Sequence, residues 1–473
     1  MFRKSLVLLL ILASAVLPAV ADCGAGALVA HSVPQSLWTA ELHPADDPDR
    51  PFPGDRDSTG YVTTTVPSCI SGHELFKDVE VLADYAFVAY NAGVQVWRIG
   101  QGAEARPQKM AFADGFYGCQ PGQAGACCGQ PFQTFIRPGE LDTAVDEVAV
   151  AAAGPDVTLI GLSGIHGVGF SAWSWSPGAG GLRQIYQDSS RDSWAVDVVN
   201  VGTVYGISAS GAGVDVYDIS RAMSCPGASC DGVRLGTVGT MGSWVSVAQS
   251  PAGRVLVAIA GGTSQDPHLE LWDLEPARPQ VAKRLVSAPR ALYHAPVLFE
   301  LAGDDLYLAA VQRAGLDTRL VIWDVGACLA GCSELPEPVY TRELLPIGTR
   351  QKLTFSRSGV TPFLYYGLPS VKLQGGTVDG LLDLSGLADG RVVEVTAGGP
   401  SYLDDCSGES VSYWSWYYPG NESGLNQYSP LAGVFRGRYF YRTANSILDI
   451  HVWSPPPALI FADGFESGDL DAW

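Results

Sequence analysis

The chain of 473 residues is poor in basic residues and has no long apolar run after its N-terminal segment. Lys and Arg number 29 against 49 Asp and Glu, which gives a formal net charge of −20. The basic residues form no cluster, whereas binding to phosphate backbones or anionic lipid heads relies on such clusters. These absences exclude nucleic acid as a partner, and no later stretch reaches the length of a transmembrane helix.

Familiar catalytic motifs are also absent. Residues 161–163 and 206–208 each begin a Gly-x-Ser pattern, but neither continues to the second glycine of a nucleophile elbow. The seven histidines are dispersed, and no His-Glu-x-x-His zinc motif occurs. The sequence therefore predicts no catalytic residues, no metal ligands and no cofactor, and it favours a binding protein over an enzyme. A triad assembled from distant segments stays open as an alternative.

Two acidic patterns bear on calcium. Residues 55–60 resemble the first half of a calcium loop, but Val66 stands at position twelve, where a bidentate Glu is needed, so a polar turn is favoured and a weak surface Ca²⁺ site stays open. The expected inner strands also carry acidic residues. Counted from the turn after each strand, Asp78 and Asp197 differ in parity, so we do not expect these residues to converge. The set comprises Asp78, Glu80, Asp146, Glu147, Asp197 and Glu300.

The N-terminus has the three-part pattern of a secretory signal peptide. Arg3 and Lys4 precede an apolar run over residues 6–17, and small residues at 19 and 21 mark a cleavage site. Asp22 stands before Cys23, where a lipidated cysteine would need a small residue. We therefore predict a signal peptide at 1–21 and a secreted or periplasmic product without a lipid anchor.

All ten cysteines follow the predicted signal peptide, so disulfides are the expected state in an exported chain. Two pairs close in sequence are predicted to be local disulfides in loops after third strands: Cys225 with Cys230, and Cys328 with Cys332. A zinc site is disfavoured because no histidine lies near either pair. The pairing of the other six is left open: Cys23, Cys69, Cys119, Cys127, Cys128 and Cys406.

A β-rich unit of forty to fifty-five residues repeats along the chain. Each unit holds an inner apolar strand, a turn, a second strand, a Gly-marked turn, and a third strand that ends in an aromatic residue, often followed by Asp. The clearest third strands are residues 94–99, 214–219, 269–274 and 320–325. Such a unit, which cannot bury both faces alone, is typical of a blade in a β-propeller.

The third strands Val-Gln-Val-Trp-Arg-Ile, Val-Asp-Val-Tyr-Asp-Ile, Leu-Glu-Leu-Trp-Asp-Leu and Leu-Val-Ile-Trp-Asp-Val resemble those of the LVIVD-type and WD-type propeller families. The Gly-His element of WD repeats is missing, so the chain is more similar to the LVIVD group. The resemblance covers about two thirds of the mature chain. It implies an architecture and diverse binding partners, and it implies no particular activity.

The fold predicted is all-β: one propeller, most simply of seven four-stranded blades with six as the fallback, closed by an N-terminal strand at 61–66 that removes a free edge. Around the propeller at 61–455 we expect an N-terminal extension at 22–60, an inserted Cys-rich loop at 116–140, and a Pro-started acidic tail at 456–473. The tail resembles the Asp-Gly-Phe-Glu-Ser-Gly-Asp signatures of secreted bacterial proteins. The blades are placed at 74–115, 141–186, 190–238, 239–287, 288–345, 346–400 and 401–455.

Aromatic residues are the main functional signal. One group recurs just before the inner strands, where it would ring one mouth of the channel, and a second group interrupts the last blade. Aromatic rings suit sugar faces or apolar peptide side chains, although packing between blades is the alternative interpretation. We expect a monomer that binds a protein or a glycan, with a hydrolase or lyase using channel carboxylates, with or without Ca²⁺, as the second hypothesis. The candidate binding residues are Phe76, Trp194, Trp244, Tyr293, Trp414, Trp416, Tyr417 and Tyr418.

Overall fold

A computed structural model describes most of residues 76–114, 145–395 and 432–454, with short internal gaps, together with 27–30, 55–56 and 62–63. The predicted signal peptide, the Cys-rich loop, the aromatic segment 413–418 and the C-terminal tail lie outside the described residues. In the described part the fold is all-β, as predicted. Its one α-helix, α2 (Ile219–Ser224), has six residues.

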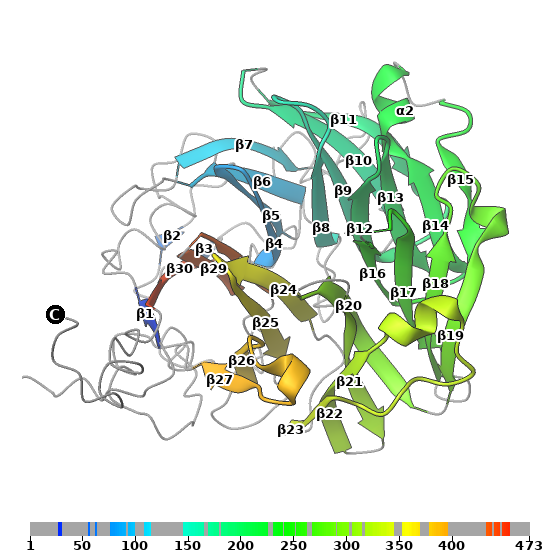
Figure 1. Cartoon of the computed structure of the whole chain (residues 1–473). Coiled ribbons are helices and arrows are strands. Elements are labelled where there is room, and N and C mark those ends of the chain that lie inside the picture. The colour runs from blue at the N-terminus through cyan, green and yellow to red at the C-terminus, as the bar shows by residue number, and fades with distance from the viewer. Residues whose placement is uncertain are drawn as a thin grey trace, which may run out of the picture.

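Six blades are each built from four consecutive antiparallel strands, the fallback count (Figure 1). Each blade runs outward from an inner strand beside the channel, and each strand pairs antiparallel with the next along the chain, which gives the regular up-and-down order. Blade 1 is β4 (Phe76–Leu82), β5 (Tyr85–Tyr90), β6 (Gly93–Arg98) and β7 (Gln108–Asp114). Blade 2 is β8 (Val145–Ala152), β9 (Thr158–Gly164), β10 (Gly169–Ser176) and β11 (Gly181–Asp188). Blade 3 is β12 (Ser193–Asn200), β13 (Val204–Ser210), β14 (Gly213–Asp218) and β15 (Arg234–Val238).

The ring continues through three further blades of the same order. Blade 4 is β16 (Trp244–Gln249), β17 (Val255–Gly262), β18 (Pro267–Leu274) and β19 (Lys283–Pro289). Blade 5 is β20 (Leu292–Glu300), β21 (Leu306–Ala314), β22 (Asp317–Asp324) and β23 (Tyr340–Leu344). Blade 6 is β24 (Lys352–Ser358), β25 (Thr361–Leu368), β26 (Val378–Asp383) and β27 (Val393–Val395).

A further four-stranded sheet stands between blades 6 and 1 and is composite. It combines β28 (Ala432–Arg436), β29 (Tyr439–Ala444) and β30 (Ile447–Ser454) with the N-terminal strand β1 (Ala27–Ala30). Strand β28 contacts both β24 and β4, so the sheet completes the ring. An N-terminal strand thus joins the last sheet, as predicted.

The prediction of which strand closes the ring was wrong. Strand β1 pairs with β30, whereas β3 (Val62–Thr63), inside the predicted strand 61–66, pairs with β2 (Asp55–Arg56). The outer position of a sheet needs only a few residues that pair on one side. The four apolar residues at 27–30 are sufficient there, opposite residues 451–454.

The third strands of blades 1, 2 and 4 share a pattern of contacts. The indole N–H of Trp97, Trp173 and Trp272 donates to the side chain two residues earlier, over 3.0, 3.1 and 2.9 Å respectively. The acceptors are Gln95, Ser171 and Glu270. The pairing with the fourth strand shifts by one residue at the same aromatic position, as in a β-bulge. In blade 3, Tyr217 replaces the tryptophan at this position.

The apolar core lies between the blades. Separate clusters of buried side chains join blade 1 to 2, 2 to 3, 3 to 4, 4 to 5, 5 to 6, and 6 to the composite sheet. Each sheet buries both faces against its neighbours, which is how a blade that is unstable alone becomes stable in an array. The inner strands are thereby fixed around the channel.

Both short cysteine pairs are bonded in the structure. Cys225–Cys230 follows α2, between the third and fourth strands of blade 3, and Cys328–Cys332 follows the third strand of blade 5. The Cα atoms are 6.0 and 4.9 Å apart, distances that suit a disulfide. No helix in the described part of the chain is long and apolar enough to cross a membrane.

Candidate functional site

The predicted aromatic residues occupy different environments at the starts of their inner strands. Trp194 in β12 has 45% of its surface exposed to solvent. Among the described residues it is the one exposed aromatic in the set of large hydrophobic side chains. Trp244 is half-buried, and Tyr293 is buried. Phe76 begins β4, but its side chain lies outside the description, as do Trp414, Trp416, Tyr417 and Tyr418.

Trp244 and Tyr293 pack between blades 4 and 5. The ring of Trp244 meets that of His294 edge to face with centroids 4.6 Å apart, and Tyr293 lies against Trp323 at 6.1 Å. His294 is buried with no hydrogen-bond partner for either ring nitrogen. Burial, with the nearby Arg313 cation, lowers the pKa of His294 to about 4. For these two aromatics the packing interpretation holds, and Trp194 is left as the exposed one.

Trp194 is exposed because the strand bulges at this residue. In the pairing of β12 with β13, Ser193 faces Ser210 and Ala195 faces Ala209, so Trp194 has no partner across the strands. The extra residue turns its side chain out of the alternating pattern. The preceding residue, Ser193, is buried instead, and its hydroxyl shares a hydrogen bond of 2.6 Å with that of Ser208 on β13.

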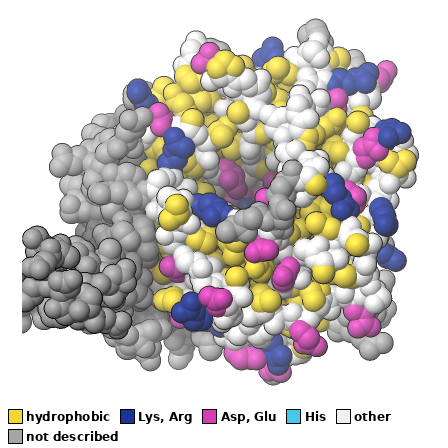
Figure 2. Space-filling view, viewed as in Figure 1, with side chains coloured by type: hydrophobic (Ala, Val, Ile, Leu, Met, Phe, Trp, Pro, Cys, Tyr) yellow, Lys and Arg dark blue, Asp and Glu magenta, His cyan; other side chains and the backbone are white. Residues whose placement is uncertain are grey.

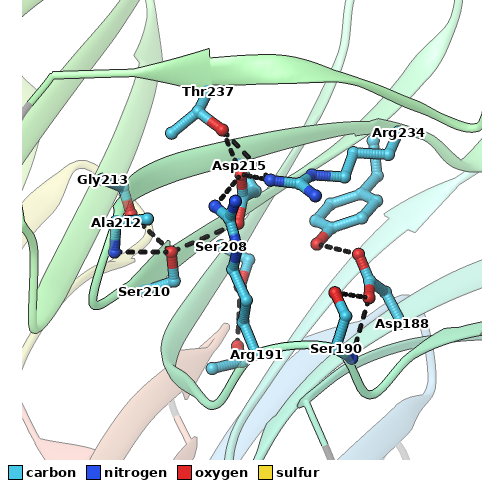
Figure 3. Close-up of polar contacts among 12 residues, drawn as sticks. Asp188, Ser190, Arg191, Ser208, Ser210, Ala212, Gly213, Asp215, Arg234 and Thr237 are labelled. Carbon is cyan, nitrogen blue, oxygen red and sulfur yellow. Dashed lines mark hydrogen bonds and ion pairs between the residues drawn. The ribbon is translucent and has the colours of Figure 1, made fainter.

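The same blade holds a buried carboxylate, Asp215 of β14, whose polar contacts Figure 3 shows. In blades 1, 2 and 4 the corresponding side chain accepts from a tryptophan, but in blade 3 Tyr217 donates its hydroxyl to Asp188 over 3.1 Å. The carboxylate oxygens of Asp215 can therefore accept hydrogen bonds from other donors. It accepts from Arg234 at 2.7 Å, from Ser210 at 3.2 Å and from the hydroxyl of Thr237. Arg191 approaches at 3.5 Å from the loop between blades 2 and 3.

That loop is held rigidly. Asp188 accepts from the backbone N–H of Ser190 at 3.0 Å, from the Ser190 hydroxyl and from Tyr217. Burial acts to raise the pKa of Asp188, but these hydrogen bonds outweigh it and the pKa lies below its ordinary value. The loop also lies close to Gly169, which has a φ of +67° and where a Cβ would collide with the carbonyl oxygens of Asp188 and Arg191. Only glycine fits this approach.

The channel is the second candidate site, because its inner strands carry converging carboxylates (Figure 2 shows charged side chains around the central hollow). These carboxylates join neighbouring blades. Asp78 accepts the N–H of Val148 at 3.1 Å, and Glu147 accepts that of Val196 at 3.1 Å. Continuing round the ring, Asp197 accepts the N–H of Val247 at 2.7 Å.

Hydroxyl groups replace the carboxylates farther round. Ser246 accepts the N–H of Leu298 at 3.1 Å, and Ser356 accepts that of Phe435 at 3.0 Å. Together the five side chains link neighbouring inner strands at five of the seven junctions of the ring: blade 1 to 2, 2 to 3, 3 to 4, 4 to 5, and 6 to the composite sheet. A buried N–H left without a partner is costly, so each link stabilises a junction between blades.

Lys352 places a positive charge next to two of these carboxylates. Its ammonium pairs with Asp78, which is fully buried, and lies 3.9 Å from Glu147. Burial acts to lower the pKa of Lys352, but the carboxylates of Asp78, Glu147 and Glu80 outweigh it, so the pKa lies above its ordinary value. Lys352 thus stays charged and binds blade 6 to blade 1 across the composite sheet.

Two channel acids titrate near neutral pH. Burial, followed by repulsion from Asp78, raises the pKa of Glu80 to about 8. Burial raises the pKa of Asp197 to about 6, although hydrogen bonds from the N–H groups of Val247 and Val198 act to lower that pKa. Acids shifted toward neutrality are characteristic of general acid–base sites. No group of three or more His, Cys, Asp or Glu within the described part could hold a metal ion.

The expectation that the inner-strand acids do not converge was wrong. Asp78 and Asp197 make the same pair of contacts, one to the next N–H on their own strand and one to the neighbouring blade. Counting from the following turn misplaced them because the strands extend unequally. Strand β4 continues four residues past Asp78, and β12 continues three past Asp197.

Comparisons with known proteins give no match in sequence and several distant similarities in structure. No family model matches the chain, and no curated protein matches it in sequence. Hydrazine synthase from Kuenenia stuttgartiensis is similar in structure, with a TM-score of 0.46 at 10% identity over 80% of this chain and 95% of that one. A Lactobacillus plantarum protein scores 0.43 at 14% identity over 72% and 89%, and YCF48 bound to D1 peptide scores 0.37 at 9% over 82% and 94%. The four-stranded antiparallel blades make the chain a β-propeller, and its likeness to the LVIVD group stays a prediction.

Sequence reasoning missed Arg191, Asp215 and Lys352. Arg191 lies in an irregular loop, where no periodicity marks it. Lys352 begins a strand and resembles any solvated lysine in sequence. Asp215 did carry a signal: it stands two residues before Tyr217, where blades 1, 2, 4 and 5 have tryptophan.

Proposed function

We propose that this chain is an exported, non-catalytic β-propeller that binds a protein or glycan partner through the channel mouth at blades 3 and 4. The exposure of Trp194 on a rigid bulge is the observation that carries the proposal. A large aromatic held open on a fixed strand presents apolar area at little entropic cost, and such residues dominate binding energy.

The arrangement of the channel acids supports a binding role over catalysis. Asp78, Glu147 and Asp197 each accept a backbone N–H from the neighbouring blade. Such carboxylates hold the ring together and have fewer lone pairs left for a substrate. The N-terminal pattern at 1–21 and the two disulfides support export.

The experiment compares wild-type protein with the Trp194→Ala variant on a glycan array and on a phage-displayed library of random peptides. We expect wild-type protein to enrich ligands in one of the two, and the variant to lose about thirtyfold in affinity for them. Failure to enrich from either library, or unchanged affinity in the variant, would overturn the proposal.

A hydrolase or lyase that uses the channel is the second candidate, and Glu80 is the observation that favours it. Its pKa, raised to about 8 by burial and by Asp78, keeps the carboxyl protonated at neutral pH, as a general acid requires. Turnover of a panel of chromogenic glycosides and uronic-acid polysaccharides, abolished in Glu80→Gln and kept in Trp194→Ala, would replace the binding proposal with this one.

A further inference from the structure

Three residues with exposed side chains are linked, each through a neighbouring residue or a shared hydrogen-bond partner, to one buried serine, Ser210 of blade 3. Ser210 faces Ser193, the neighbour of Trp194, and its carbonyl accepts the N–H of Gly242, the neighbour of Met241, at 3.2 Å. Its hydroxyl donates to Asp215, which Arg191 approaches. Met241 is 38% exposed and the side chain of Arg191 39%. We name Arg191, Trp194 and Met241 the mouth patch.

The cation of the mouth patch is only loosely held. Asp215 already accepts from Arg234 at 2.7 Å, from Ser210 and from Thr237, so its charge is compensated without Arg191. The contact of Arg191 with Asp215 is long, at 3.5 Å, and uses one of the five N–H donors of a guanidinium. The remaining donors match the two oxygens of an incoming carboxylate.

The patch is fixed before any partner arrives. The hydrogen bonds of Asp188 and the close approach at Gly169 hold the loop that carries Arg191. The bulge in β12 holds Trp194 three residues farther on. A surface that needs no ordering on binding keeps more of its contact energy as affinity.

The patch suits a peptide better than a sugar. The hydroxyls beneath it bond to one another or to Asp215, since Ser193 bonds to Ser208 and Ser210 bonds to Asp215. They are buried and offer nothing to the hydroxyls of a sugar. What faces outward is a tryptophan, a methionine and an arginine, the residue types enriched where proteins meet proteins.

We infer that the mouth patch recognises a protein segment that carries a carboxylate beside an apolar side chain. The carboxylate pairs with the Arg191 guanidinium, and the apolar side chain packs on Trp194 and Met241. This inference rests on the proposed function and gives it a partner of defined chemistry.

The test selects from the phage-displayed random peptide library and then measures synthetic copies of the enriched peptides. We expect an Asp or Glu next to an aromatic or aliphatic residue. Arg191→Ala should lower affinity on the order of tenfold, and replacing the peptide carboxylate by its amide should do the same. The two changes together should cost no more than either alone, because they remove one interaction. Arg183→Ala, at an exposed arginine on the outer strand β11, is the matched control and should change nothing.

Each alternative outcome counts against a different claim. Trp194-dependent binding found only on the glycan array would overturn this inference and leave the proposed function standing. Peptides bound without an acidic residue, or equal losses in Arg191→Ala and Arg183→Ala, would also overturn it. Absence of Trp194-dependent binding in both libraries would overturn both. Thermal unfolding of each variant, with Arg191→Lys as a second substitution, separates lost binding from lost folding.

Discussion

The channel and the mouth patch contain similar residue types but use them in opposite ways. In the channel, Asp78, Glu147 and Asp197 accept N–H groups from neighbouring blades, and Lys352 closes the set against Asp78. In the mouth patch, Arg191 makes one long contact and Trp194 has no partner across the strands. Charges whose partners belong to the chain stabilise the fold, whereas groups held in place without full partners are available to a ligand.

The strongest way to break this comparison is to remove Asp78. Asp78→Ala leaves the Lys352 ammonium short of its nearest counterion and the N–H of Val148 without an acceptor, so we expect a loss of about 3–5 kcal/mol in the free energy of unfolding. Urea unfolding measures it. Asp389→Ala, which breaks an exposed pair with Arg391 of 3.0 Å, is the control and should cost less than about 1 kcal/mol. Similar small losses in both variants would show that the channel carboxylates do not hold the ring.

Gly169→Ala tests the mouth side of the comparison through the backbone. The φ of +67° and the collision with the Asp188 and Arg191 carbonyls should cost about 1–3 kcal/mol and displace the loop that carries Arg191. Peptide affinity should therefore fall more than in Gly178→Ala, where a Cβ meets nothing within 4 Å. Equal stability of the two alanine variants in thermal unfolding would contradict the argument that the loop is held against this glycine.

The repeat made the blades predictable from the sequence, whereas positions outside the repeat could not be predicted. An aromatic residue that closes the third strand, as in Trp97 and Trp272, marks a blade whatever its other residues are. The strand at 27–30 has no such mark, because a run of four apolar residues also suits a helix. Convergence of Asp78 with Asp197 depends on how far each strand runs past the channel, and that length is set by contacts between blades.

The mouth patch was half predictable. Trp194 recurs at a repeat position, which singled it out together with Trp244 and Tyr293, but only the structure separates the exposed one from the packed ones. The difference arises from the bulge beside Ser193, and a bulge is decided by the pairing of two strands rather than by either strand alone.

The pH dependence of stability sharpens the comparison on the channel side. Burial, followed by repulsion from Asp78, raises the pKa of Glu80 from its ordinary value of 4.5 to about 8. The folded state therefore binds more protons than the unfolded state between these values, and the stability contributed by this group falls as the pH rises from about 4.5 through 8. Glu80→Gln removes the titration, so its stability relative to wild type should increase over that window. Parallel curves from thermal unfolding at several pH values would contradict a protonated Glu80.

The smallest expected effect is on the mouth side, where removing Trp194 should barely change the fold. The side chain is 45% exposed and pairs with no residue across the strands, so Trp194→Ala should change the free energy of unfolding by less than about 0.5 kcal/mol. Trp97→Ala is the matched control, because Trp97 is 2% exposed and its loss leaves a cavity and an unpaired Gln95, which should cost about 3–5 kcal/mol. If Trp194→Ala approaches the cost of Trp97→Ala in urea unfolding, Trp194 belongs to the packing between blades. The mouth patch would then lack an aromatic side chain that is available to a ligand, and the contrast with the channel would disappear.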